Sequence, residues 1–298
     1  TPKPTVAASN APTMHGLQST YRDYTAYQAT SHPSLPNYCA MSSGSFLGKV
    51  GTDNGSVGFA GTAANIMHQL ELAGKSWKAY EEGVTAAGFT SWTGNLYGGK
   101  HCPAAFYTTT KTAGIGAGNG RFDFSGTGGL VADINSNTLP DFFYITPNLL
   151  NDGHNLPPSG DRIKYSDDWL AGLNPNGNSP AFPGITALIA AMRPDGVLFV
   201  TYDEGSGSNQ TIYTVCVGQR VTHSVITAAQ SHWSLLYGIQ QNFGQPKFTE
   251  QGQNLDSGYV SVANPIPIPQ TGSGSTGSTG IDLGTTRTYT PSALPLGG

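Results

Sequence analysis

Ser34 is the first residue of this sequence whose position suggests chemistry, because it lies within Ser31–Tyr38 between Pro33 and Pro36. Proline disfavours helix in the residue before it, so we expect an extended segment or turn up to Leu35 and a helix only from Pro36 onward. Ser34 would then lie at or just before a helix N-terminus, where backbone N–H groups attract an anion. Its hydroxyl could attack a phosphate or cap the helix, and the local sequence alone favours the cap.

Two acidic residues, Asp203 and Glu204, directly follow the apolar run at 196–202, which we interpret as a strand. In an α/β sheet, functional groups gather in the loops beyond the carboxyl ends of the strands. Adjacent carboxylates at a strand end suit a hard divalent cation, so both residues are candidate metal ligands. The alternative interpretation is a solvated turn that carries two charges.

A second polar cluster, Asp152 with His154, follows the apolar run at 141–146. Two further histidines, His101 and His232, lie in a loop and at a predicted helix start. An imidazole in such a place can contact a bound anion or protonate a leaving group. Three histidines without such a context are interpreted as structural or surface residues: His15, His68 and His223.

Regular elements must position these side chains, and the apolar spacing predicts which segments form them. Strands are expected at 76–83, 141–146, 196–202 and 212–217. Helices are expected at 63–73, 169–173, 185–192 and 232–243. The alternation of strands and helices predicts an α/β fold, a three-layer α/β/α sandwich with a largely parallel central sheet.

The composition limits the partners and the location. The net charge is -4 and only 11% of residues are charged, which argues against nucleic acid, since that partner needs a basic face. No apolar run reaches membrane-spanning length, and no signal peptide pattern is present. Two glycosylation sequons, at Asn54 and Asn209, together with the polar composition, favour a secreted or extracytoplasmic location.

The three cysteines, Cys39, Cys102 and Cys216, are widely spaced and form no metal-binding pair. One disulfide with a free thiol and three buried thiols are both open. Residues 265–298 differ from the rest in being rich in Pro, Gly, Ser and Thr, so we divide the chain into a domain at 1–264 and a tail. Within the tail, 281–291 could form a strand or be disordered.

Eight motifs in register between about residues 11 and 250 carry a family resemblance. They are His32–Tyr38, Gly74–Gly83, Lys100–Pro103, Leu139–Phe142 with Ile145–Asn148, Asn151–His154, Asp167–Leu170, Tyr202–Gly205 and Ser231–Leu236. With these motifs the chain resembles the phosphoesterase family of acid phosphatases and bacterial phospholipases C. That family belongs to the alkaline-phosphatase-like superfamily.

The resemblance implies a role for each matching residue. Ser34 matches the nucleophile, which forms a phospho-enzyme and also contacts the metal, and Asn37 matches a residue that helps to hold the phosphate. Asp203 and Glu204 match the acidic metal-binding positions. The histidines that match the phosphate site are His154, His232 and, with a weaker match, His101. Two acids match positions near that site without a defined role: Asp152 and Asp167.

One departure from the family concerns its first core strand, which ends in a Glu-Asn pair that completes the metal site. The sequence from Thr1 to Pro12 contains neither the apolar strand nor the pair, so we expect the chain to lack them. Three explanations stay open: the strand was cut away or belongs to a separate chain, another subunit donates it, or the sequence is incomplete. The segment 281–291 is a candidate for donation between subunits.

The leading functional hypothesis is a metal-dependent phosphoric ester hydrolase that works through a phosphoserine, with a divalent cation and a phosphate ester substrate. A second hypothesis is a catalytically degenerate scaffold that acts as an extracellular assembly subunit through strand or tail exchange. A third is a module that binds phosphate or glycan without hydrolysis. A homo-oligomer is compatible with the second hypothesis.

Overall fold

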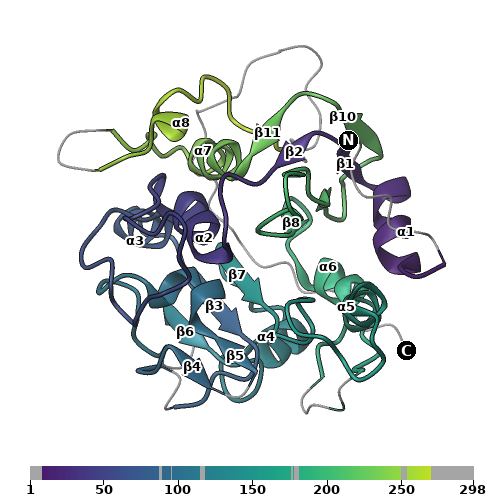
Figure 1. Cartoon of the computed structure of the whole chain (residues 1–298). Coiled ribbons are helices and arrows are strands. Elements are labelled where there is room, and N and C mark those ends of the chain that lie inside the picture. Colours follow the sequence, from purple (N-terminus) through teal and green to yellow (C-terminus); the bar gives the residue numbers. More distant parts are fainter. Residues whose placement is uncertain are drawn as a thin grey trace.

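The computed structural model describes residues 9–86, 89–94, 96–114, 118–175, 177, 181–249 and 254–269 (Figure 1). The tail segment 281–291, for which a strand and a disordered segment were both open, lies outside these residues. Within the described residues before it, Ile266 is fully buried and its N–H donates to the carbonyl of Ser234, so the chain still packs on the domain here. No helix in the described ranges is long and apolar enough to cross a membrane.

A three-stranded parallel sheet has the order β6-β3-β7. Its strands are Gly120–Phe122, Trp77–Glu81 and Phe142–Thr146. The central strand β3 is buried along its whole length, in agreement with its place between two neighbours. The register sets Glu81 beside Thr146, so the carboxyl ends of β3 and β7 meet at one edge.

A four-stranded mixed sheet has the order β10-β1-β9-β8. Its strands are Ser224–Ile226, Arg22–Tyr24, Thr214–Val217 and Leu198–Thr201. Strand β9 runs antiparallel to both neighbours, whereas β1 and β10 are parallel. Two small sheets complete the strands: β2 (Tyr27–Gln28) pairs with β11 (Gln230–Ser231), and β4 (Thr93–Gly94) pairs with β5 (Tyr97–Gly98).

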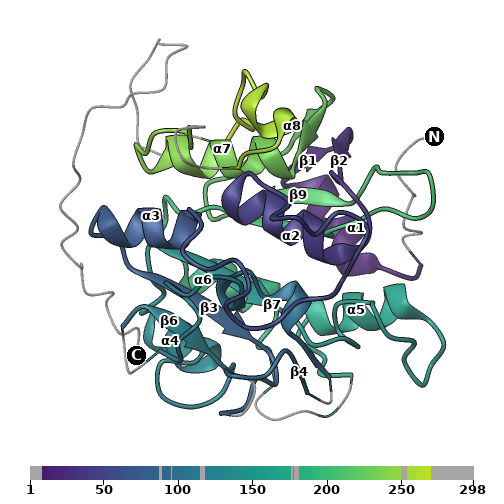
Figure 2. The ribbon, with the colours of Figure 1, turned by 60° about the vertical axis from the view of Figure 1, so that its left-hand side comes forward.

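Helices cover both faces of these sheets. They are α1 (Pro12–Thr20), α2 (Ser34–Ser43), α3 (Ile66–Leu72), α4 (Leu130–Ser136), α5 (Arg162–Leu170), α6 (Ile185–Ala191), α7 (His232–Asn242) and α8 (Ser257–Val260). One core cluster joins α1, α4, α5 and α6 to one face of β7 and β8. A second joins α2, α3 and α7 to the opposite face of β3 and β7, and Figure 2 shows α2 and α7 above these strands.

The predicted α/β fold with parallel-rich sheets is therefore confirmed. The best-defined periodic segments match closely, since 185–192 forms α6 and 196–202 contains β8. Strand β6 was not predicted, because it lies in the Gly- and Thr-rich stretch between 85 and 129 and has only three residues. The three cysteines are free, buried thiols. Of the two open alternatives, three buried thiols is therefore the one observed.

Strands β7 and β8 each have one unpaired edge among the described residues. Strand β7 pairs only with β3, and β8 pairs only with β9. Both strands are apolar, and four of the five residues of β7 and all four of β8 are only partly buried. Unpaired apolar edges of this kind are sites where another strand can add.

Candidate active site

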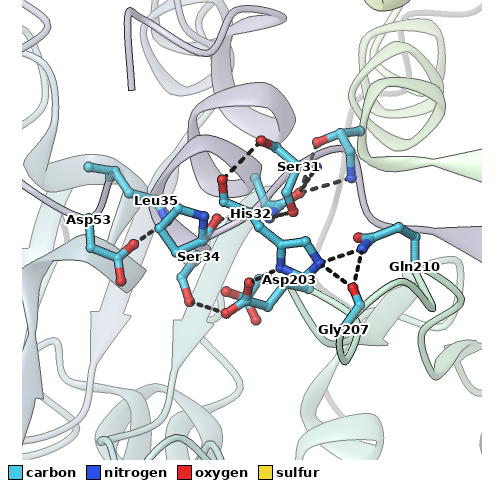
Figure 3. Close-up of polar contacts among 12 residues, drawn as sticks. Ser31, His32, Ser34, Leu35, Asp53, Asp203, Gly207 and Gln210 are labelled. Carbon is cyan, nitrogen blue, oxygen red and sulfur yellow. Dashed lines mark hydrogen bonds and ion pairs between the residues drawn. The ribbon is translucent and has the colours of Figure 1, made fainter. Parts of the chain in front are cut away.

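Helix α2 begins at Ser34, so the nucleophile candidate is the first helical residue and is 2% exposed. Its hydroxyl does not cap the helix. Instead, Ser34 Oγ donates a hydrogen bond of 3.1 Å to Glu204 Oε1, which lies in the loop after β8 (Figure 3). The capping role that the local sequence favoured is therefore wrong, and the serine faces the acidic strand end.

Glu204 is held from its other side by His32. His32 Nδ1 donates to Glu204 Oε2 at 2.6 Å, and His32 Nε2 lies 3.2 Å from the carbonyl of Gly207 and also contacts the side chain of Gln210 (Figure 3). The carboxylate thus bridges an imidazole and the Ser34 hydroxyl. This fixes the orientation of Glu204 relative to the serine.

Asp203 presents a free oxygen at the same strand end. Its Oδ2 atom is buried and has no hydrogen-bond partner. Its backbone carbonyl accepts a hydrogen bond of 2.6 Å from His232 Nε2, and His232 Nδ1 accepts from Tyr27 Oη at 3.1 Å. Burial lowers the pKa of His232, which favours the neutral imidazole. Its hydrogen bond to the Asp203 carbonyl holds the backbone just after β8 in place.

His101 also presents a free atom. Its Nδ1 donates to Asp152 Oδ2 at 2.9 Å, whereas its Nε2 is buried and has no partner. The ring centroid lies 5.2 Å from that of Tyr38 on α2. Burial, followed by the negative charges of Asp203, Asp152 and Glu204, raises the pKa of Tyr38 well above its usual value. The charges of the three carboxylates therefore act on one tyrosine of α2.

A cation and a fourth imidazole lie at the outer side of this cluster. Lys100 Nζ donates to Asp53 Oδ2 at 2.6 Å and to His154 Nε2 at 3.0 Å. Asp53 Oδ1 in turn accepts from the Leu35 N–H at the start of α2. Burial raises the pKa of Asp53, but the bonds from Lys100 and Leu35 outweigh it, so the pKa lies below its usual value. His154 itself is exposed.

Two residues matched to the family's phosphate site make other contacts in this structure. Asn37 is fully buried, and its side chain accepts from the N–H groups of Thr30 and Ser31 and donates to the carbonyls of Ser31 and Pro33. It therefore holds the loop that precedes Ser34. Asp167 binds the N–H groups of Thr13 and Met14, at the start of α1.

The predicted metal ligands offer an oxygen-rich set. Asp203 Oδ2 is buried without a partner, Glu204 lies beside it in sequence, and Ser34 Oγ lies within hydrogen-bond distance of Glu204. Carboxylate and hydroxyl oxygens are the donors that hard divalent cations prefer, so these residues fit part of such a site. In the described residues, no three His, Cys, Asp or Glu side chains converge as a metal site, so solvent, substrate or further residues would complete the coordination.

Comparison with known families shows which family the chain belongs to. The model of the Phosphoesterase family matches residues 18–234, which is well over half of the chain. The chain therefore belongs to the Phosphoesterase family. The matched range contains Ser34, the His101–Asp152 pair and the strand end with Asp203 and Glu204.

Named relatives agree with this membership. A phosphatidylinositol-3-phosphatase of Mycobacterium tuberculosis is 26% identical over 265 residues, 88% of this chain and 76% of that protein. A probable acid phosphatase of Kluyveromyces lactis is 26% identical over 242 residues, 74% of this chain but 51% of that protein. The phosphate-repressible acid phosphatase of Penicillium chrysogenum is 24% identical, with 80% and 57% covered. The chain thus spans about half the length of these fungal relatives.

Among solved structures, a protein in the alkaline phosphatase superfamily from Vibrio parahaemolyticus aligns with a TM-score of 0.47 and 13% identity, over 79% of this chain and 61% of that chain. The family membership rests on the sequence comparisons. Together with the phosphatase names of the relatives, it supports the predicted enzyme class, the phosphoric ester hydrolases.

Sequence reasoning did not assign a role to four residues of the cluster. Tyr38 and His32 lie in the same short motif as Ser34, so the sequence indicated that they lie near the site. Asp53 lies in a Gly-, Ser- and Asn-rich loop that matched no motif, and only the fold brings it to the start of α2. Lys100 had a weak signal, as the neighbour of His101.

Proposed function

We propose that the chain hydrolyses phosphate esters with Ser34 as nucleophile and a divalent cation bound at Asp203, Glu204 and Ser34. The observation that carries this proposal is the hydrogen bond from Ser34 Oγ to Glu204 Oε1, next to the unpartnered Asp203 Oδ2. A buried hydroxyl that donates to a carboxylate keeps its lone pairs available for attack on phosphorus. Helix capping would not leave the hydroxyl in this orientation.

In the first step, Ser34 Oγ attacks the phosphorus atom, the bond from phosphorus to the ester oxygen breaks, and the alcohol leaves. The hydroxyl proton moves away along the bond to Glu204, and the leaving oxygen takes up a proton. In the second step, water attacks the phosphoserine, releases inorganic phosphate and restores the hydroxyl. A bound cation would neutralise charge on the phosphoryl oxygens and lower the pKa of the serine hydroxyl.

We assign protonation of the leaving oxygen to the imidazole of His101. Its Nε2 atom is buried and unpartnered, and Asp152 orients the ring through Nδ1. His154 is exposed and contacts Lys100. We therefore propose that it contacts the bound phosphate on the side that faces solvent. His232 and Asn37 act as positioning residues, since their polar atoms bind Tyr27, Asp203 and the loop before Ser34.

We also place the protein outside the cytoplasm. Two sequons and a surface poor in charged residues support this location. Treatment of the naturally produced protein with an N-glycosidase, followed by electrophoresis, tests it. A shift in mobility is expected, and its loss is expected when Asn209 is replaced by Gln, whereas Asn54 is expected to stay unmodified because it lines a cavity.

Hydrolysis of an aryl phosphate tests the proposed activity. The wild-type protein should release phosphate, and EDTA should abolish the activity until a divalent cation is restored. Ser34→Ala should lower kcat at least 10³-fold, because the covalent step is lost. The matched control is Ser31→Ala, which removes a hydroxyl from the same loop and should retain most of the activity. Full activity in Ser34→Ala would remove this residue from the mechanism.

The unpaired edges of β7 and β8 favour a second candidate function. Each strand leads into the cluster, since the loop after β7 carries Asp152 and the loop after β8 carries Asp203. Their apolar, partly buried residues would suit a strand that is apolar on both faces. In this candidate, a second copy or a separate chain supplies a strand, and the protein serves an assembly.

Light scattering over a range of concentrations, with hydrogen exchange of the amides in β7 and β8, separates the two candidates. The assembly predicts an oligomer whose β7 and β8 amides become protected on association. A monomer at all concentrations that hydrolyses phosphate esters would contradict it. An oligomer without turnover would favour the assembly over the enzyme.

A further inference from the structure

A cavity of about 580 Å³ lies beside the catalytic cluster, and its wall includes Asp53, Asn54, Trp92, Tyr97, Lys100 and Leu149. It shares Asp53 and Lys100 with the cluster. Asp53 binds the Leu35 N–H next to Ser34, and Lys100 contacts His154. The cavity therefore lies next to the cluster, close to the start of α2. Its volume lies in the range of about 300–1,000 Å³ that small-molecule sites occupy.

The apolar part of the wall is firmly built. The Trp92 ring packs edge-on against Phe59 at a centroid distance of 5.8 Å and lies at the same distance from Phe106. A Cβ atom at Gly55 would lie 2.5 Å from the Trp92 ring, so only glycine permits this close approach. The indole is therefore held firmly by its neighbours, and Trp92 is one of the residues that line the cavity.

The polar part of the wall is electrically balanced. Lys100 and Asp53 form an ion pair of 2.6 Å, and no other charged side chain lines the cavity. A second phosphate or a carboxylate would have to compete with Asp53 for the lysine. Asn54 and Thr93, which are exposed, offer neutral hydrogen-bonding groups at the rim. The wall thus suits a neutral occupant with several hydroxyl groups.

We propose that this cavity binds the alcohol portion of the ester, and that this portion is a neutral polyhydroxylated ring, such as a sugar. The inference rests on the proposed function of the neighbouring cluster. One face of such a ring carries C–H groups that pack on the Trp92 indole, while its hydroxyls hydrogen-bond to Asn54 and Asp53. An acyclic polyol lacks the flat apolar face, and an unsubstituted aryl group leaves the polar rim unpaired.

Two substrates test this inference as a matched pair, glucose 6-phosphate and glycerol 1-phosphate. In both, a neutral polyol is esterified through a primary alcohol, and only the polyol of the first contains a ring. The wild-type protein should show a kcat/KM at least tenfold higher for glucose 6-phosphate, mainly through a lower KM. Trp92→Ala should reduce this preference to threefold or less and leave kcat/KM for glycerol 1-phosphate within twofold of the wild-type value.

Two further variants keep the test decisive if Trp92→Ala does not fold. Trp92→Phe retains an aromatic platform and should retain most of the preference. Asn54→Ala changes an exposed loop residue and should lower the preference at least threefold. Calorimetry with glucose 6-phosphate in a Ser34→Ala background gives a readout besides activity, and addition of Trp92→Ala should weaken binding at least fivefold.

The outcomes distinguish this inference from the proposed function. Equal kcat/KM for the two substrates, or equal effects of Trp92→Ala on both, would overturn the ring-binding cavity while the phosphatase activity stands. If no phosphate ester is hydrolysed, the proposed function fails, and the calorimetric comparison alone then decides the cavity. Unchanged binding in the Trp92→Ala background would overturn it.

Discussion

Ser34 Oγ donates a hydrogen bond of 3.1 Å to Glu204 Oε1, although the two residues are 170 positions apart in the sequence. Ser34 is positioned by the start of α2, and Glu204 by the end of β8. This contact depends on how the helix layer that contains α2 packs on the sheet that contains β8. Changes that loosen either element are therefore expected to affect catalysis before they affect folding.

The two loop histidines should differ in importance. His101→Asn is expected to lower kcat about 10²- to 10⁴-fold, because it removes the buried Nε2 that we assign to the leaving group. His154→Asn should lower kcat tenfold or less, because this residue is exposed and contacts Lys100. Steady-state kinetics on one aryl phosphate compares them. A larger loss in His154→Asn would reverse the assignment.

His32 should act through Glu204. His32→Ala removes the 2.6 Å contact that orients the carboxylate, so we expect the concentration of divalent cation needed for half-maximal activity to rise about 10- to 100-fold. His32→Asn places a donor near the position of Nδ1 and should recover part of the loss. Cation titrations of both variants measure this. An unchanged cation requirement in His32→Ala would show that Glu204 needs no such support.

Asp53 should stabilise the fold in a manner that depends on pH. Its folded-state pKa lies below the value of about 3.9 in an unfolded chain. The folded state thus binds the proton less tightly, so the stabilisation is complete above about pH 4 and is lost as the pH falls through the lower folded-state pKa. Because Asp53 is partly exposed, we expect Asp53→Asn to cost only about 0.3–1 kcal/mol.

Urea unfolding of the wild type and Asp53→Asn at several pH values measures this difference. The gap between the two free energies of unfolding should be constant from pH 7 to pH 5 and close below about pH 4. A gap that widens as the pH falls would contradict the sign of the pKa shift.

The buried ion pair between β3 and β6 should matter more for stability. Arg121 is fully buried, and its guanidinium donates to both oxygens of Glu81 at 2.8 and 2.7 Å. Glu81→Gln leaves the cation without a charged partner, which costs about 3–5 kcal/mol. Denaturant unfolding measures this, with Asp195→Asn as the control, since Asp195 lies in an exposed pair with Arg193. Equal stabilities of the two variants would refute the role of the buried pair.

Strong periodicity made several elements predictable from the sequence. The apolar spacing of 185–192 and the continuous apolar run at 196–202 determine α6 and β8 to within a few residues. The acidic pair after β8 was predictable because functional groups gather at the carboxyl ends of strands. Short strands in Gly-rich segments, such as β6, were not predictable, because their pairing with β3 is decided by tertiary contacts.

The orientation of individual side chains was harder to predict than their location. Asn37 and His232 lie near the site, as the family resemblance implied, but their polar atoms bind the surrounding backbone and Tyr27. Whether such a residue faces the substrate or its supporting shell depends on the rotation of α2 and α7, which a motif does not encode. Asp53 had no sequence signal, because only the fold brings its loop to α2.

Identification of the phosphorylated residue tests the central claim most directly. The wild-type protein is mixed with an aryl phosphate and a divalent cation, quenched in acid during the first turnover, digested and analysed by tandem mass spectrometry. We predict a phosphoryl group on Ser34 that is absent from Ser34→Ala and disappears when the substrate is exhausted. A phosphoryl group on another residue, or an unmodified Ser34 throughout the first turnover, would contradict the account.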